Sequence, residues 1–182
     1  METKIRYFVH GTTYDNAAEK YSGWKQVELT DLGKEQAENL GEINKNINFD
    51  VVFTSDLVRA IDSANIAFPK CKKIQDSRLR ECNYGDFDGE SKELVVYEEH
   101  IDEPFPNGES LKDVEKRVLE FIEYIKIEYP GKYIAIVAHR APQLALEVLT
   151  KKISWEEANA NDWRKTKSWQ PGWDYIIEEV NK

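Results

Sequence analysis

Short runs of apolar residues, each bounded by polar or turn-forming residues, divide the chain into predicted β-strands. These runs cover residues 5–9, 50–53, 72–75 and 133–138. Their β-branched and aromatic residues favour strands, and the unbroken apolar run 133–138 is typical of a strand buried on both faces. Alternating apolar and polar residues in 173–177 predict a final strand, although 178–179 suit a helix equally well.

Between these runs, apolar residues recur every three or four positions, which is the spacing of one face of an α-helix. Helices are predicted near residues 30–47, 56–68, 110–125 and 142–150. Thr30 is a good N-cap for the first, and Ser110 with Asp113 forms a capping box at the start of the third. The inner face of the first helix is predicted to comprise Leu32, Gln36, Ala37, Leu40, Ile43 and Ile47.

The alternation of strands and helices predicts an α/β fold, a three-layer α/β/α sandwich with a mainly parallel central sheet. The length of 182 residues suits a single domain over 1–182, and no repeat or linker interrupts it. Residues 14–29 are predicted to be mostly loop, while the acidic stretch 90–107 gives no clear pattern.

Polar residues follow three of the predicted strands at the point where each strand ends. They are His10 and Gly11, then Thr54 and Ser55 with Arg59 in the next helix, and finally His139 and Arg140. Because the carboxyl ends of parallel strands meet at one edge of the sheet, these groups are predicted to converge on a ligand site. The alternative is that the two histidines have only structural roles at strand ends.

Two histidines and an arginine at one sheet edge suit an anion, since the guanidinium fork of Arg59 matches phosphate oxygens. A histidine attacks phosphorus through a neutral ring nitrogen, and a second histidine, if protonated, adds positive charge around the phosphoryl oxygens. A loop carboxylic acid is needed to protonate the leaving oxygen. Glu81 is the candidate because Gly85 and Gly89 give its loop an unusual path; the alternative is a solvated loop glutamate.

The formal charge of −9 argues against general binding to nucleic acid or to an anionic membrane. The two cysteines, Cys71 and Cys82, have no metal-ligand spacing and are too few for a disulfide scaffold, so they are predicted to be reduced thiols. No signal-peptide pattern and no run of ~18 apolar residues is present, which predicts a cytoplasmic protein.

The order of motifs along the chain resembles the histidine phosphatase superfamily, which has the phosphoglycerate mutase-like fold. The matching segments are VHGTT at 9–13 with Asn16, LTDLGKEQA at 29–37, TSDLVRAIDSA at 54–64, LRECNYGDFDG at 79–89, NGES at 107–110 and IAIVAH at 134–139. They follow the family order over residues 4 to about 145. The remaining C-terminal residues carry no motif of the family.

The resemblance implies a covalent mechanism that needs no metal and no cofactor. His10 attacks the phosphoryl group and becomes a phosphohistidine, Arg59 and His139 stabilise the transferred charge, and Glu81 protonates the leaving oxygen. Further phosphate or substrate contacts are expected from Gly11, Thr12, Asn16, Ser22, Gly23 and Arg140.

The chain departs from the family pattern at Val9, where relatives place an arginine. Losing one charge-assisted contact to phosphate costs about 1.5–3 kcal/mol. Our hypothesis is that Arg140, beside His139, restores the missing charge; Arg6 is a weaker substitute, and a surface arginine is the alternative for Arg140.

The leading interpretation is a hydrolase for a small-molecule phosphomonoester, acting as a monomer or homodimer. The alternatives are a catalytically weak phosphate- or phosphoprotein-binding homologue and a phosphoglycerate-type mutase; the short chain favours the hydrolase. Residues 86–109 carry nine carboxylates and one lysine, which predicts either an acidic rim that repels polyphosphorylated substrates or a solvated surface. The C-terminal tryptophans are predicted to pack over a sheet edge rather than to line a substrate wall; they are Trp155, Trp163, Trp169 and Trp173.

Overall fold

A computed structural model of the chain describes residues 2–177, and its centre is a five-stranded sheet in the order β3-β2-β4-β1-β5. The strands are β1 (Thr3–Val9), β2 (Val51–Thr54), β3 (Lys73–Gln75), β4 (Tyr133–Ala138) and β5 (Trp173–Ile177). The first four are parallel, and β5 pairs antiparallel with β1. The mainly parallel sheet and the final strand are therefore confirmed; residues 178–179 lie outside the described residues.

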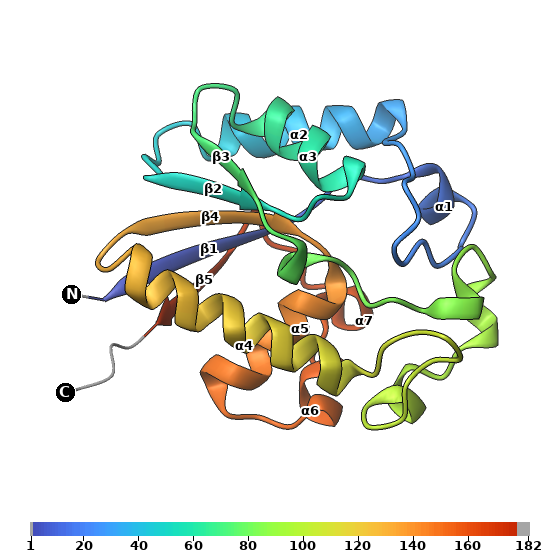
Figure 1. Cartoon of the computed structure of the whole chain (residues 1–182). Helices are drawn as coiled ribbons and strands as arrows, with labels where there is room; N and C mark the ends of the chain where they lie inside the picture. Colours follow the sequence, from blue (N-terminus) through green and yellow to red (C-terminus); the bar gives the residue numbers. More distant parts are fainter. Residues whose placement is uncertain (1, 178–182) are drawn as a thin grey trace.

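Helices cover both faces of this sheet and complete the three layers. They are α1 (Tyr14–Ala17), α2 (Asp31–Ile43), α3 (Val58–Ala67), α4 (Leu111–Glu128), α5 (Arg140–Lys151), α6 (Trp155–Ala160) and α7 (Trp163–Thr166). Figure 1 shows α2 and α3 on one face, α4 and α5 on the other, and α6 outside α5. Short 3₁₀ turns lie in the long connection before α4, at Ser77–Leu79, Gly85–Phe87, Lys92–Leu94 and Tyr97–His100.

The alternation of side chains along the strands divides the core into two halves. Tyr7, Phe53 and Ile136 pack with the apolar stripe of α4 and α5, whereas Phe8 and Val137 pack with α2 and α3. Because β4 is buried on both faces, it lies between the two halves and fixes the sheet edge at which the polar motifs meet.

The inner face of α2 differs from the prediction. Leu32 and Ile43 are 55% and 49% exposed, and the buried residues of this helix are Gly33, Ala37 and Leu40. A Cβ at Gly33 would lie 2.1 Å from the carbonyl oxygen of Thr12, so α2 approaches the loop after β1 backbone to backbone. The face of α2 that carries Gly33 therefore lies against this loop, and the two larger side chains lie in solvent.

Two further details differ from the prediction. Helix α5 begins at Arg140 rather than near Pro142, because proline is tolerated in the first turn of a helix. The loop after β1 contains the short helix α1, which Thr13 caps together with Asn16. Across residues 2–177, no helix is long and apolar enough to cross a membrane.

Candidate active site

His10 follows β1 directly, and its ring orientation is set by its own neighbour. The imidazole Nδ1 lies 2.7 Å from the carbonyl oxygen of Gly11, which assigns the proton to Nδ1 and leaves the lone pair on Nε2. Burial of the ring, followed by the charge of Arg59, lowers the pKa of His10 to about 3. The imidazole is therefore neutral at physiological pH, the state that a nucleophile requires.

The loop after His10 is fixed by two backbone contacts. The Gly11 N–H donates to the hydroxyl of Ser63 at 3.0 Å, and a Cβ at Gly11 would lie 2.2 Å from the carbonyl oxygen of Gly33. Only glycine fits this approach. Thr12 donates through its N–H and hydroxyl to the side-chain oxygen of Gln36, at 2.8 and 2.9 Å.

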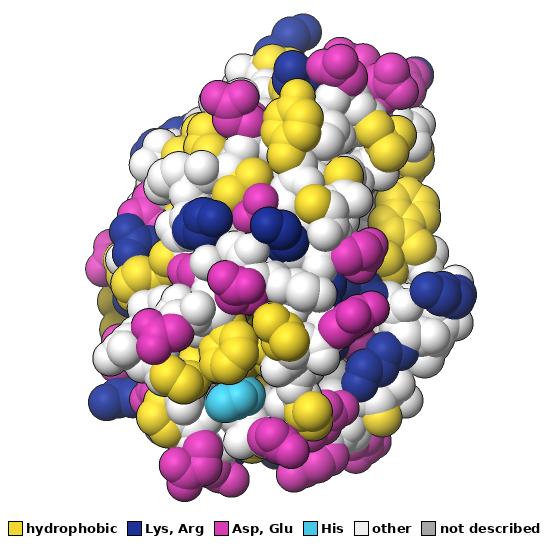
Figure 2. All heavy atoms as spheres, turned by 90° about the vertical axis from the view of Figure 1, so that its right-hand side faces the viewer, with side chains coloured by type: hydrophobic (Ala, Val, Ile, Leu, Met, Phe, Trp, Pro, Cys, Tyr) yellow, Lys and Arg dark blue, Asp and Glu magenta, His cyan; other side chains and the backbone are white. Residues whose placement is uncertain are grey.

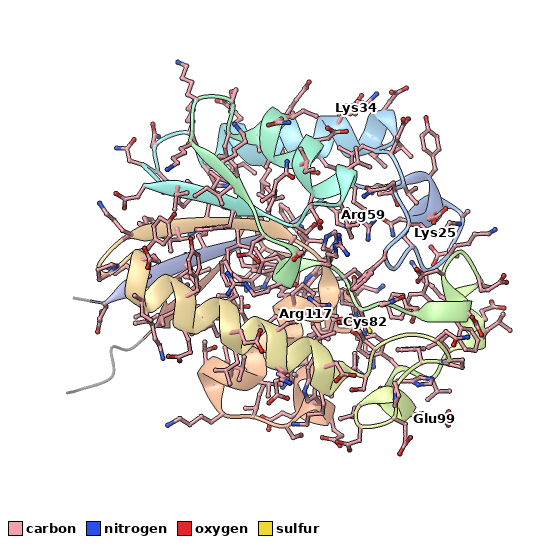
Figure 3. All side chains as sticks on the ribbon, viewed as in Figure 1. Lys25, Lys34, Arg59, Cys82, Glu99 and Arg117 are labelled. Atoms are coloured by element: carbon pink, nitrogen blue, oxygen red, sulfur yellow. The ribbon has the colours of Figure 1, made fainter. Side chains whose placement is uncertain are left out.

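Arg59, in the first turn of α3, is almost fully buried beneath the pocket. Its guanidinium donates to the carbonyl oxygens of Gly23 at 2.7 Å and Lys25 at 2.9 Å. Figure 3 shows Arg59 between α3 and the loop that carries Lys25. The hydroxyl of Ser22 in this loop is buried and has no partner among the described residues. The predicted grouping of Arg59, Ser22 and Gly23 around one pocket is present.

His139 lies behind His10, with ring centroids 5.0 Å apart and no exposed surface. Its Nε2 lies 2.6 Å from the hydroxyl of Ser55, and its Nδ1 has no partner among residues 2–177. The phenol of Tyr7 accepts from the His139 N–H at 3.0 Å and donates to its carbonyl at 2.8 Å. Burial, then the charge of Arg59, lowers the pKa of His139 well below its usual value, so the ring is neutral in the free site.

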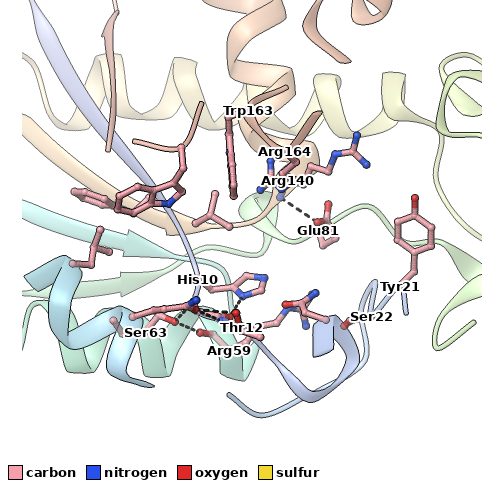
Figure 4. Close-up of a pocket in the computed structure, with 18 of the residues that line it drawn as sticks. His10, Thr12, Tyr21, Ser22, Arg59, Ser63, Glu81, Arg140, Trp163 and Arg164 are labelled. Atoms are coloured by element: carbon pink, nitrogen blue, oxygen red, sulfur yellow. Dashed lines mark hydrogen bonds between the residues drawn. The ribbon is translucent and has the colours of Figure 1, made fainter. Parts of the chain in front are cut away.

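Glu81 lies at the amino end of α5, where backbone donors converge on its carboxylate. Oε1 accepts from the N–H groups of Cys82 and Ala141, both at 2.9 Å, and Oε2 accepts from the Arg140 N–H at 3.1 Å. Figure 4 shows this carboxylate facing the pocket that contains His10. Glu81 is thus a placed site residue rather than a solvated loop side chain.

Arg117 on α4 holds the loop that carries Glu81. It donates to the carbonyl oxygens of Arg78 and Arg80, both at 2.7 Å, and of Glu81 at 2.9 Å, while it pairs with Glu109 at 2.9 Å. The sequence offered no signal for this role, since Arg117 lies within an ordinary amphipathic helix.

The guanidinium of Arg140 has protein partners of its own. It donates to Asp162 at 2.7 Å and to Asn159 at 2.8 Å, and its Cζ lies 4.2 Å from the ring centroid of Tyr97. Only its backbone N–H contacts Glu81. Arg6 pairs with Asp174 on β5 at 2.7 Å. Each candidate substitute for the missing charge is therefore paired with a carboxylate, although the Arg140 side chain still lines the pocket.

A pocket of about 880 Å³ extends over His10 and contains the predicted residues except His139. Those on its walls are His10, Gly11, Thr12, Asn16, Ser22, Gly23, Arg59, Glu81 and Arg140. Trp163, Trp169 and Trp173 also line it, which favours the substrate-wall alternative for these three, although Trp173 on the edge strand β5 also packs against the core; Trp155 is buried in the core.

The acidic segment 86–109 contributes only Lys92 to the pocket wall, and none of its nine carboxylates. Figure 2 shows many acidic side chains along the lower part of the face that carries this segment, and in Figure 3 Glu99 lies at the periphery, away from Arg59. The placement favours the solvated-surface interpretation over the repulsive rim.

In residues 2–177, no group of three or more His, Cys, Asp or Glu side chains is arranged to hold a metal ion. The described site offers instead a neutral imidazole, a buried guanidinium and a carboxylate around one pocket. This set can accept a phosphoryl group on nitrogen and neutralise part of its charge.

Comparison with known proteins identifies the family. The family profile described as "Histidine phosphatase superfamily (branch 1)" matches residues 7–170. A 2,3-bisphosphoglycerate-dependent phosphoglycerate mutase from Cytophaga hutchinsonii is 33% identical over 165 residues, covering 81% of this chain and 77% of that protein. The chain belongs to the histidine phosphatase superfamily, as its motifs predicted.

Solved structures show the same fold. Bacillus stearothermophilus YhfR is 26% identical with a TM-score of 0.77, covering 86% of this chain and 83% of its own. The alpha-ribazole phosphatase from Shigella flexneri is 25% identical with a TM-score of 0.75, covering 85% of this chain and 83% of its own. Proteins named as mutases and as phosphatases therefore both occur among the relatives.

Proposed function

We propose that this protein is a metal-independent phosphomonoester hydrolase that acts through a phosphohistidine on His10. The observation that carries the proposal is the fixed tautomer of His10, whose Nδ1 is held by the Gly11 carbonyl at 2.7 Å. The free Nε2 lone pair belongs to a ring that lines the same pocket as Arg59 and Glu81. A soluble small-molecule monoester in the cytoplasm is the expected substrate.

In the first step the Nε2 lone pair of His10 attacks phosphorus, a P–N bond forms, and the bond from phosphorus to the leaving oxygen breaks. The leaving oxygen takes a proton from the carboxyl group of Glu81. Arg59 neutralises charge on the transferred oxygens. His139 lies behind His10, and its unpartnered Nδ1 is a further donor when the Ser55 hydroxyl donates to its Nε2.

In the second step the Glu81 carboxylate accepts a proton from water while the water oxygen attacks phosphorus. The P–N bond breaks, its electron pair returns to Nε2 of His10, and orthophosphate leaves. Glu81 is then protonated again, ready for another cycle, and no metal or cofactor takes part in either step.

A phosphoglycerate-type mutase is the second candidate, favoured by the names of relatives such as the Cytophaga hutchinsonii protein. A mutase returns the phosphoryl group to a sugar acid rather than to water. Incubation with 3-phosphoglycerate and a trace of 2,3-bisphosphoglycerate separates the two activities. Formation of 2-phosphoglycerate without orthophosphate release would support the mutase.

The test of the hydrolase is orthophosphate release from p-nitrophenyl phosphate in EDTA, with wild type compared to His10→Ala. We expect activity that resists chelation and is absent from the variant. Inactive wild type that is folded and binds orthophosphate would instead support a phosphate-binding homologue. Activity that EDTA abolishes, or that His10→Ala retains, would overturn the proposed mechanism.

A further inference from the structure

We propose that Arg164 is a second phosphate-binding residue of this pocket, supplying positive charge from the C-terminal segment in addition to that of Arg59. The inference rests on the proposed function, because it assumes that the pocket over His10 takes a phosphoryl group. It concerns a residue outside every motif that the chain shares with its family.

The need for a second cation follows from the charges already placed. A phosphomonoester brings up to two negative charges, whereas the rings of His10 and His139 are neutral in the free site. Arg59 is cationic, but two of its N–H groups are directed to the carbonyls of Gly23 and Lys25. One guanidinium therefore leaves the phosphoryl oxygens incompletely neutralised.

Arg164 lies on the pocket wall that faces His10. Figure 4 shows it beside Trp163, across the pocket from Thr12 and Arg59. Its Cζ lies 4.2 Å from the ring centroid of Trp163, so the indole supports the guanidinium. Its charge is also one of the causes that lower the pKa of His10, which places the two groups within electrostatic reach.

The buried carboxylate of Asp162 positions Arg164 but does not neutralise both nearby arginines. Asp162, whose side chain is fully buried, accepts from Nη1 of Arg164 at 3.0 Å and from Nε of Arg140 at 2.7 Å. One negative charge thus faces two guanidiniums, and a net positive charge remains. Arg140 gives a second hydrogen bond, to Asn159, whereas the guanidinium of Arg164 donates to Asp162 alone among the described residues and keeps more N–H groups for a ligand.

The backbone reinforces this placement. Asp162 caps α7 by accepting from the Arg164 N–H at 3.1 Å, so the same carboxylate fixes both the main chain and the side chain of Arg164. The Arg164 side chain is 26% exposed, so a ligand in the pocket can reach its guanidinium. Arg164 is therefore preorganised rather than a freely moving surface residue.

The experiment is titration calorimetry of orthophosphate into the intact protein near neutral pH, for wild type, Arg164→Met and Arg164→Lys. Orthophosphate has no ester body, so its affinity reports phosphate contacts alone. We expect the Kd to rise about tenfold in Arg164→Met, since a charge-assisted contact is lost, and less in Arg164→Lys. Lys167→Gln, an exposed cation just after α7, is the matched control and should bind as wild type does.

Each outcome separates this inference from the proposed function. Orthophosphate affinity that is unchanged in Arg164→Met, with an active wild type, overturns the role of Arg164 and leaves the hydrolase intact. A change restricted to esters that carry a second anionic group means that Arg164 contacts the ester body, which also contradicts the inference. A weaker Kd in Arg164→Met with an inactive wild type supports the inference and overturns the hydrolase. No binding to an active wild type overturns the role of Arg164 and leaves the hydrolase intact, whereas no binding to an inactive wild type overturns both.

Discussion

The imidazole Nδ1 of His10 lies 2.7 Å from the carbonyl oxygen of Gly11, the next residue in the chain. The shape of this turn therefore sets the tautomer of the proposed nucleophile. The turn is held in place by Gly33 of α2, whose carbonyl oxygen would lie only 2.2 Å from a Cβ on Gly11. The contact between Gly11 and the backbone of α2 thus fixes the turn that determines the tautomer of His10.

We expect Gly33→Ala to reduce activity without altering any group in the pocket. Its Cβ would meet the Thr12 carbonyl at 2.1 Å and displace the loop that orients His10. Overpacking of this kind costs about 1–3 kcal/mol of the free energy of unfolding, and the misplaced nucleophile should lower kcat by at least about tenfold. Steady-state kinetics and urea unfolding measure the two effects.

Gly41→Ala is the matched control on the same helix. A Cβ at Gly41 would lie 2.5 Å from the carbonyl oxygen of Ala67, so this variant should lose comparable stability. The three atoms nearest to that Cβ all belong to Ala67, which does not line the pocket, and kcat should stay close to that of wild type. Equal losses of kcat in both variants would show that general destabilisation, rather than loop position, limits activity.

We assign the proton of His139 to Nδ1, with the Ser55 hydroxyl accepting from the Leu57 N–H at 3.3 Å and donating to Nε2 at 2.6 Å. Ser55→Ala should then lower kcat by up to about tenfold, because it removes this donor. KM for p-nitrophenyl phosphate should change little. ¹⁵N NMR of the imidazole resonances reports the tautomer directly. A wild type in which Nε2 of His139 carries the proton would contradict this assignment.

Arg117→Met should release the loop that positions Glu81. The variant removes three hydrogen bonds to loop carbonyls and leaves the partly buried Glu109 unpaired, at a cost on the order of 3 kcal/mol. We expect kcat to fall about tenfold through the loss of orientation. Arg78→Met removes a nearby ion pair with Asp76 and should leave kcat unchanged; a similar loss there would argue against a specific role for Arg117.

The two histidines of the site, His139 fully buried and His10 half-buried, should make the protein less stable as the pH falls from about 7 to 5. An unfolded histidine takes up a proton near pH 6.5, whereas His10 folded does so only near pH 3 and the pKa of His139 is also lowered. In this interval the unfolded chain binds more protons, so the free energy of unfolding decreases, by up to about 1.4 kcal/mol per pH unit for each histidine.

Urea unfolding at several pH values measures that slope. His10→Asn should give a flatter dependence than wild type, because one of the two titrating groups is gone. The partial exposure of His10 makes its contribution smaller than the upper bound. Parallel slopes for wild type and the variant would show that His10 titrates normally in the folded protein.

Much of the fold was predictable because its signals are local. The unbroken apolar run of β4 and the capping box of Ser110 and Asp113 both appear in the structure as predicted. The convergence of His10, Arg59 and His139 followed from the geometry of parallel strands alone. Exposure of Leu32 was not predictable, because it results from a long-range contact between Gly33 and the loop after β1.

The C-terminal part of the site was hidden for a different reason. The placement of Trp163 and Arg164 depends on Asp162. Its carboxylate binds Arg140, which lies 22 residues earlier at the start of α5, and it also caps α7. No periodic pattern reports such a contact. Tyr7 was likewise read only as an apolar strand residue, although its phenol holds both backbone groups of His139.

The measurement that tests the central claim most directly is trapping of the covalent intermediate. The protein is mixed with a ³²P-labelled phosphomonoester, quenched within milliseconds in base, and digested for mass spectrometry. We predict an acid-labile, base-stable phosphoryl group on Nε2 of His10, absent from His10→Ala. Turnover without any label, or a label on another residue, would contradict catalysis through a phosphohistidine at His10.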